Sequence, residues 1–125
     1  MKLIHLTDTH FVRPGERLYG LDPRARLDAC IADINRHHGD AALAVITGDL
    51  THYGDKAAFL ALRDSLRALT VPVRLLLGNH DTVETFRAVF PDAPVDADGR
   101  VQSVDDTPAG RLIFLDTNLS GTHAG

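Results

Sequence analysis

The chain has 125 residues, 44% hydrophobic and 24% charged, which is the composition of an ordinary globular domain and argues against disorder. Its formal net charge of −4 and its scattered Lys and Arg residues disfavour duplex nucleic acid as a partner. Cys30 is the single cysteine, and the start of the chain resembles neither a signal peptide nor a membrane-spanning segment, so we expect a cytoplasmic protein without a membrane partner.

Apolar runs typical of buried strands alternate with helical patterns. The runs span residues 2–7, 42–47 and 71–77. Helical spacing of apolar residues predicts one helix after Asp22 and Pro23, a second over Asp55–Ala68 and a shorter one over Val83–Val89. Because the strands are apolar on both faces and alternate with helices, we expect an α/β fold with a mostly parallel sheet covered by helices.

The pattern changes after Pro91. Residues 92–99 are a polar loop, and the apolar runs 101–104 and 112–115 flank a turn-forming segment, which predicts a hairpin or a sheet edge. No repeat or linker divides the chain, so residues 1–125 are interpreted as part of a single domain. The chain stops at Gly125 in a loop, and we expect that this is not the end of the domain.

Each predicted strand ends in side chains that can bind a divalent metal. Asp8 and His10 follow the first strand, Asp49 follows the second, and Asn79 and His80 follow the third. The carboxyl ends of parallel strands gather at one edge of a sheet, so these residues are expected to converge. In an extended segment Asp8 and His10 lie on one side and can reach one ion. Carboxylate, imidazole and amide ligands suit Mn, Fe, Zn or Co better than Cu(I) or Ca.

Each of these pieces also has an ordinary structural explanation. Asp8 and His10 alone are typical of a cap or a turn, Asp49 of a strand exit, and Gly78–Asp81 of a helix start. A glycine before Asp49 and another before Asn79 let the backbone turn sharply. All three pieces in order, each directly after a buried strand, favour a metal site over coincidence.

Three stretches resemble the first three signature motifs of the calcineurin-like metallophosphoesterases: Asp8-x-His10, Gly48-Asp49-x-x-His52 and Gly78-Asn79-His80-Asp81. The resemblance covers essentially the whole chain. The motif spacing and the segment Thr9–Gly20 are most similar to the bacterial glycerophosphodiesterases and the class III cyclic-nucleotide phosphodiesterases.

The resemblance implies a sandwich of mixed sheets flanked by helices, with its N-terminal half present here. It implies two divalent metal ions, with Asp8 and His10 on the first, Asp49 bridging both and Asn79 on the second. His80 would contact the phosphate or the leaving group, and a metal-bound hydroxide would attack a small-molecule phosphodiester. The sequence contains none of the family's later histidine motifs, so we expect this chain alone to be a poor enzyme.

Two other functions stay open. The first is a phosphomonoesterase or a nuclease on the same scaffold. The second is a metal-free interaction module, although such a module has no reason to desolvate Asp8 and Asp49 side by side. Half a sandwich also leaves apolar surface and a free strand edge near residues 112–115, so we expect a homo-oligomer.

Other polar residues carry weaker signals. His52 is interpreted as an exposed residue before the second helix rather than a support of the site, and Asp81 as a helix cap rather than a carboxylate that orients a ligand. His5 lies inside an apolar run and is expected in the core. Roles in covering the substrate or lining the cleft stay open for Arg13, Arg17, Tyr19, Asp116, Asn118 and His123.

Overall fold

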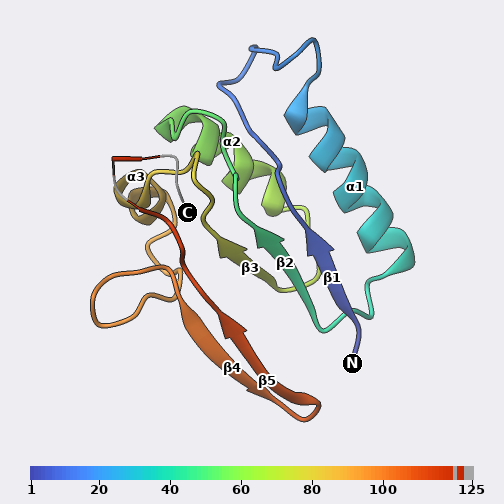
Figure 1. Cartoon of the computed structure of the whole chain (residues 1–125). Coiled ribbons are helices and arrows are strands. Elements are labelled where there is room, and N and C mark those ends of the chain that lie inside the picture. The colour runs from blue at the N-terminus through green and yellow to red at the C-terminus, as the bar shows by residue number, and fades with distance from the viewer. Residues whose placement is uncertain (120, 123–125) are drawn as a thin grey trace.

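The computed structural model describes residues 1–119 and 121–122. Within them the elements are, in chain order, β1 (Leu3–Leu6), α1 (Pro23–His37), β2 (Leu43–Thr47), α2 (Lys56–Leu66), β3 (Val73–Leu76), α3 (Val83–Val89), β4 (Ser103–Thr107) and β5 (Gly110–Phe114). Strands β1, β2 and β3 form a parallel sheet in that order, with α1 and α2 as the crossovers (Figure 1). The predicted α/β class and all of its expected elements are confirmed.

Helix α1 begins where its capping residues place it. The Asp22 carboxylate accepts a hydrogen bond from the Ala25 amide at 3.2 Å, and Pro23 occupies the first helical position. This cap uses one of the amides that a helix start leaves without a partner. The buried stripe of the helix consists of Leu27, Ile31 and Ile34.

The two crossover helices pack on one face of the sheet. That face carries Ala44, Ile46 and Leu75, all buried beneath α1 and α2. The opposite face is only partly covered, because β1 alternates between exposed and half-buried residues. The prediction of strands buried on both faces is therefore wrong for β1. His5 shows the consequence: it is exposed, and its Nε2 lies 2.7 Å from the Thr47 hydroxyl, so it is not a core histidine.

Parallel pairing aligns the ends of the strands. Leu6 is level with Ile46, and Thr47 is level with Leu76. The chain therefore leaves β1, β2 and β3 at the same edge of the sheet, which is where side chains from distant parts of the sequence can meet.

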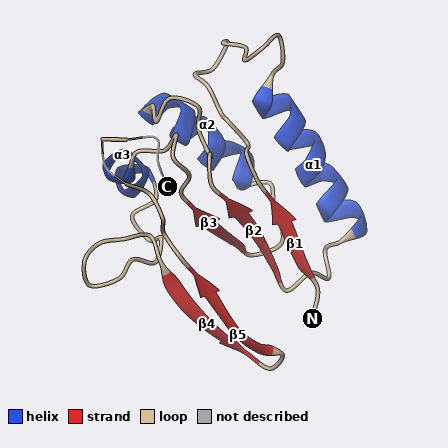
Figure 2. Cartoon of the chain, viewed as in Figure 1, coloured by secondary structure: helices blue, strands red, loops and turns tan. Residues whose placement is uncertain are grey.

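Strands β4 and β5 form the predicted antiparallel hairpin, with Thr107 opposite Gly110 (Figure 2). The hairpin contacts β3 through Arg74. The guanidinium of Arg74 donates a hydrogen bond to the Asp105 carboxylate and lies over the Phe114 ring, 5.3 Å from its centroid. This contact holds the hairpin against β3, an edge strand of the parallel sheet.

The hairpin exposes three large apolar side chains. Val104, Ile113 and Leu115 have between 52% and 64% of their surface accessible. Since monomeric proteins seldom expose apolar strand surface, we expect the 125-residue chain to associate with a second copy of itself. Ile113→Lys is expected to lower the mass measured by light scattering, whereas Leu60→Lys on α2 is expected to leave it unchanged. A monomeric wild-type chain would contradict this expectation.

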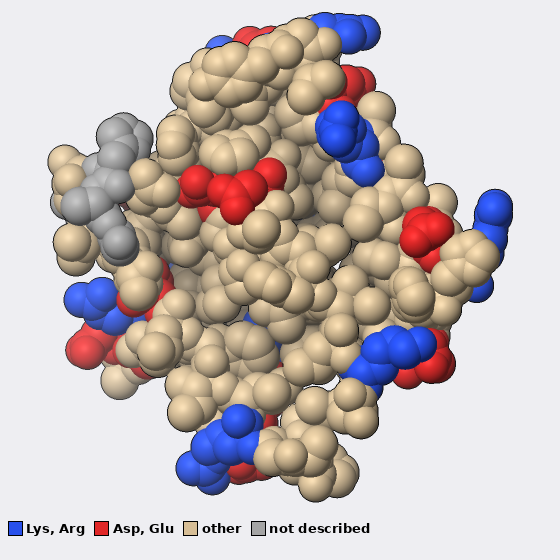
Figure 3. Space-filling view, turned by 45° about the vertical axis from the view of Figure 1, so that its right-hand side comes forward, with Lys and Arg blue, Asp and Glu red and all other residues tan. Residues whose placement is uncertain are grey.

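Charged side chains of both signs are interspersed on the surface. On the face shown in Figure 3, Lys and Arg do not gather into a single patch. Several form ion pairs, such as Lys2 with Asp40 at 2.6 Å and Arg111 with Asp106 at 2.7 Å. Among the described residues, no helix is both long and apolar enough to cross a membrane.

Candidate metal centre

The carboxyl ends of β1 and β2 bring together three of the predicted ligands. Metal-binding atoms of Asp8, His10 and Asp49 all lie within 4.8 Å of one another. His10 Nε2 is 3.5 Å from Asp8 Oδ1 and 3.6 Å from Asp49 Oδ2. Two carboxylates and an imidazole nitrogen thus face a common point.

These three residues share an unusual backbone conformation. The φ angles of Asp8, His10 and Asp49 are 56°, 44° and 45°, in the left-handed region that side chains other than glycine seldom occupy. Such a residue costs on the order of 1–3 kcal/mol and persists where its surroundings hold it, typically at functional sites. Here the amides of Asp8 and His10 donate to the carbonyls of Gly48 and Asp49 at 3.2 and 2.8 Å. The expectation of an extended Asp8-x-His10 segment is therefore wrong, although the two side chains do converge.

The fourth predicted ligand, Asn79, lies at the border between two hollows. Together with Asp8 and Asp49 it lines a pocket of about 430 Å³. It also lines a larger adjoining pocket of about 1410 Å³, where its neighbours include His52 and His80. Asp8, Asp49, Asn79 and His80 therefore line two hollows that share Asn79, and His10 lies beside Asp8 and Asp49.

The electrostatics of the cluster suit a divalent cation. Among the described residues, the ion-pair partner of both Asp8 and Asp49 is His10, and no Lys or Arg pairs with either carboxylate. Thr7 supports Asp8, since its hydroxyl donates to Asp8 Oδ2 at 2.5 Å. Adjacent carboxylates without a neutralising side chain repel each other, and a bound cation removes this cost. The oxygen and imidazole donors fit the metals predicted from the sequence.

Gly78 lets the turn after β3 approach Asp49. A Cβ atom at Gly78 would lie 2.1 Å from the Asp49 amide nitrogen and 2.2 Å from Asp49 Oδ1. The next turn of chain then bonds the same carboxylate, because the His80 amide donates to Asp49 Oδ1 at 3.1 Å. The sequence suggests that this glycine serves a sharp turn, and the structure shows that it permits a close approach.

Gly78→Ala is expected to displace the Asp49 carboxylate. Overpacking against fixed backbone should lower the free energy of unfolding by roughly 1–3 kcal/mol and weaken metal binding as well. Gly39→Ala is the control, because a Cβ there meets nothing nearer than 3.3 Å. Thermal unfolding and metal titration of both variants provide the measurement, and wild-type metal affinity in Gly78→Ala would contradict the expectation.

Asp81 is buried and joins the turn after β2 to the turn after β3. Its carboxylate accepts hydrogen bonds from the amides of Leu50, Thr51 and Gly78 and from the Thr51 hydroxyl, all between 2.8 and 2.9 Å. Burial raises the pKa of Asp81, and these hydrogen bonds act against the rise. The cap interpretation of Asp81 is wrong: the N-cap of α3 is Thr82, and it makes no side-chain capping bond.

Asp81→Ala is expected to destabilise the fold strongly. Its loss leaves buried donors of Thr51 and Gly78 without an acceptor, and each such group costs about 1–3 kcal/mol. Asp33→Ala, an exposed position on α1, serves as control. Denaturant unfolding should show a loss of at least about 2 kcal/mol for Asp81→Ala and little change for the control. An unchanged unfolding midpoint in Asp81→Ala would refute the role of this carboxylate.

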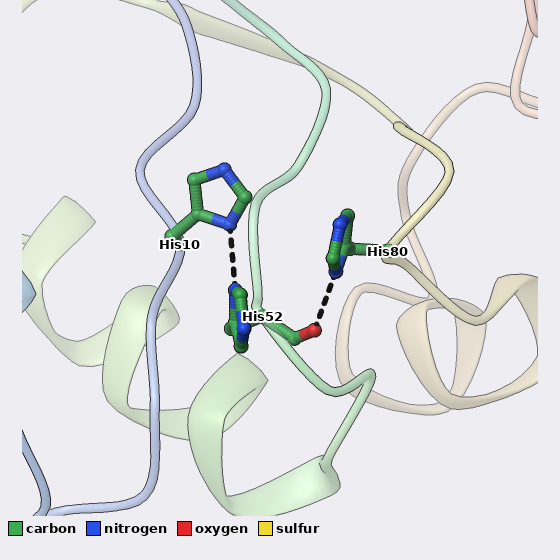
Figure 4. A group of neighbouring side chains, drawn as sticks. All are labelled: His10, His52 and His80. Atoms are coloured by element: carbon green, nitrogen blue, oxygen red, sulfur yellow. Dashed lines mark hydrogen bonds between the residues drawn. The ribbon is translucent and has the colours of Figure 1, made fainter. Parts of the chain in front are cut away.

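A second cluster consists of imidazoles, with nitrogens of His10, His52 and His80 all within 4.8 Å of one another (Figure 4). His10 Nδ1 is 3.1 Å from His52 Nδ1, and His80 Nδ1 is 2.8 Å from the His52 carbonyl oxygen. The expectation that His52 is exposed and apart from the site is wrong, because it is half-buried between the two motif histidines. Burial, followed by the neighbouring His80 and His10, lowers the pKa of His52.

Two residues that sequence reasoning left unassigned hold the turn after β3. The Asn118 side chain donates to the carbonyls of Gly78 and Asp81 at 2.7 and 3.0 Å. Asp116 is buried, and its carboxylate accepts from the amides of Asn118 and Val101 at 2.9 and 3.0 Å. No local pattern in the sequence signals the contacts of Asn118, because they join segments 40 and 37 residues apart.

The loop after His10 carries the remaining open candidates. Arg13 pairs with Asp55 at 3.1 Å, and Arg17 donates to the Gly20 carbonyl at 3.3 Å. Tyr19 is 87% exposed, and its ring lies edge-on to His52 with centroids 6.2 Å apart. Roles for Arg13, Arg17 and Tyr19 in covering a substrate remain predictions, and His123 lies outside the described residues.

Fold and site together define an α/β protein with a candidate metal centre at the carboxyl edge of its parallel sheet. Comparison with known families gives the same assignment in finer detail, since the calcineurin-like phosphoesterase family matches residues 1–123. The chain belongs to this family. The predicted family membership is thereby confirmed.

Several relatives are phosphodiesterases by name. The chain is 49% identical to a probable cyclic nucleotide phosphodiesterase of Rhodopseudomonas palustris over 117 residues. This aligned stretch is 94% of this chain and 43% of the relative. It is 33% identical to a glycerophosphodiester phosphodiesterase of Enterobacter lignolyticus, over 100% of this chain and 46% of the relative. It is 32% identical to a cAMP/cGMP dual specificity phosphodiesterase of Mycobacterium tuberculosis, over 98% of this chain and 40% of the relative. The chain thus spans less than half the length of these relatives.

Proposed function

We propose that the protein to which this chain belongs hydrolyses small phosphodiesters with the aid of two divalent metal ions. Residues 1–125 would contribute the N-terminal part of one phosphoesterase domain. The convergence of Asp8, His10 and Asp49 within 4.8 Å, without a Lys or Arg partner among the described residues, carries the proposal. Family membership and the names of the relatives support the phosphodiester as substrate class.

The proposed ligand roles are those that the family resemblance implies. Asp8 and His10 would hold a first ion, Asp49 would bridge to a second, and Asn79 would bind the second from the turn after β3. Divalent Fe, Mn, Zn or Co held by these residues would supply a hydroxide nucleophile at neutral pH and would neutralise charge on the phosphoryl oxygens. The His80 amide donates a hydrogen bond to Asp49 Oδ1, and the other carboxylate oxygen, Oδ2, faces His10.

His80 is suited to proton transfer beside this cluster. A carbonyl oxygen can only accept, so His80 Nδ1 must carry the hydrogen in its 2.8 Å contact with the His52 carbonyl. Nε2 is then the atom that gains or loses a proton. A protonated Nε2 can donate to the oxygen of the leaving alcohol as its bond to phosphorus breaks, and the imidazole becomes neutral.

The hollow beside His80 is large enough for a small organic diester. Its volume of about 1410 Å³ exceeds the range of roughly 300–1,000 Å³ that is common for small-molecule sites. Arg87 and Arg100 line it and would supply positive charge toward an anionic substrate. Both a cyclic nucleotide and a glycerophosphodiester fall within this class.

Activity assays on the full-length native protein test the proposal. Cyclic AMP and glycerophosphocholine represent the two diester classes, and p-nitrophenyl phosphate represents monoesters. We expect hydrolysis of at least one diester, loss of activity after chelation and recovery with Mn²⁺ or Co²⁺. Monoester hydrolysis alone, or diester hydrolysis that survives complete removal of metal, would refute the proposal.

A further inference from the structure

His52 contacts both motif histidines through different atoms. Its ring nitrogen Nδ1 lies 3.1 Å from His10 Nδ1, while its main-chain carbonyl accepts from His80 Nδ1 (Figure 4). The ring also stacks on that of His80, with centroids 4.9 Å apart and an interplanar angle of 24°. The side chain of His52 therefore touches both motif histidines, and its main chain touches His80 alone of the two.

The backbone at His52 is fixed by the strand-like segment after Asp8-x-His10. The His52 amide donates to the Phe11 carbonyl at 2.9 Å, and the Phe11 amide donates to the Leu50 carbonyl at 2.9 Å. Phe11 and Leu50 are themselves buried. The main chain at His52 is thus held by packed neighbours.

The two nitrogens of His10 face different partners. Nε2 faces the carboxylates of Asp8 and Asp49 at 3.5 and 3.6 Å, and Nδ1 faces His52. A nitrogen that binds a metal must be free of hydrogen, so the hydrogen of a neutral His10 resides on Nδ1. His52 Nδ1 must then be the acceptor, with the hydrogen of His52 on Nε2. Such a bond fixes both the tautomer and the orientation of a ligating imidazole.

We propose that His52 is a positioning residue of the metal centre, which accepts the Nδ1 hydrogen of His10 and holds His10 Nε2 toward Asp8 and Asp49. This inference rests on the proposed function, because it assumes that Nε2 of His10 binds a metal. The main-chain carbonyl of His52 does not depend on its side chain, so replacement of the ring removes its contact with His10 and its stacking on His80 but keeps the acceptor for His80 Nδ1.

Two substitutions of His52 test the role of its ring. His52→Ala removes the acceptor, whereas His52→Asn restores one, because asparagine carries Oδ1 on Cγ where histidine carries Nδ1. His37→Ala, an exposed histidine on α1, is the control. The probe is Co²⁺, titrated into the metal-free full-length native protein and followed by its visible absorption, and far-UV circular dichroism checks the fold.

We expect His52→Ala to bind Co²⁺ with the wild-type stoichiometry but roughly 10- to 100-fold more weakly, with altered visible bands. His52→Asn should recover most of the affinity and the wild-type bands, and His37→Ala should match wild type. Unchanged Co²⁺ affinity in His52→Ala would overturn the inference. Loss of one Co²⁺ per chain in both His52 variants would overturn it too, by making His52 a ligand. A wild-type protein that binds no Co²⁺ would refute the proposed function, and the inference with it.

Discussion

Asp49→Ala is expected to reduce diesterase turnover to background and to lower the metal content of the full-length native protein. Asp49 faces His10 with Oδ2 and receives the His80 amide on Oδ1, so it links the β1 and β2 ligands to the turn after β3. If Asp49 bridges two ions as proposed, its loss would remove a bond and a compensating charge from both together. The effect should exceed the roughly 10- to 100-fold cost of losing a supporting residue at a metal site.

Metal analysis and steady-state kinetics on the same sample test this expectation. Asp33→Ala, an exposed aspartate on α1, is the matched control and should keep both metal and activity. Turnover near the wild-type rate in Asp49→Ala would remove Asp49 from the bridging position. Loss of activity with full metal content would show that Asp49 contributes to catalysis without binding metal.

His80→Ala should separate catalysis from metal binding. The variant is expected to keep its metal but to lose turnover by roughly 10²- to 10⁴-fold, because Nε2 of His80 is the proposed proton donor to the leaving group. The effect should be largest for a diester with a poorly acidic leaving alcohol. A substrate with a p-nitrophenol leaving group needs little protonation, so its rate should fall less.

Comparison of these two substrates in wild type and His80→Ala is the measurement. His38→Ala, beyond the end of α1, is a control for histidine removal. Loss of metal from His80→Ala would make His80 a ligand. Equal rate losses for both substrates would exclude proton donation to the leaving group and leave His80 a role in binding the phosphate.

The positions of the candidate ligands could be predicted because strand ends are encoded locally. Apolar runs followed directly by Asp8, Asp49 and Asn79 indicate where each strand stops, and parallel topology then places these stops at one edge of the sheet. The helix signals were equally local, and the cap formed by Asp22 appears as expected. Element identity and site location therefore followed from residues close together in sequence.

The geometry inside the site could not be predicted in the same way. The left-handed backbone of Asp8 and His10 is held by hydrogen bonds that their amides donate to carbonyls of the segment after β2, about forty residues away. The burial of Asp81 and the contact between His52 and His10 arise from the same long-range approach. A cap and an exposed loop residue were the natural local interpretations, and tertiary contacts overrode both.

The exposure of His5 has a related cause. An apolar strand with a histidine in its middle predicts burial, but α1 and α2 cover only the face of the sheet that carries Ala44 and Ile46. Sequence pattern marks a strand as apolar without telling which neighbour covers each face. The hairpin reaches β3 through Arg74 and leaves β1 uncovered on that side.

Anomalous scattering from crystals of the full-length native protein grown with Mn²⁺ tests the central claim most directly. We expect an anomalous peak within bonding distance of Asp8, His10 and Asp49 and a second peak shared by Asp49 and Asn79. Asp8→Asn should weaken the first peak more than the second. Anomalous density confined to other parts of the protein, with Asp8 and Asp49 free of metal at saturating Mn²⁺, would contradict the account.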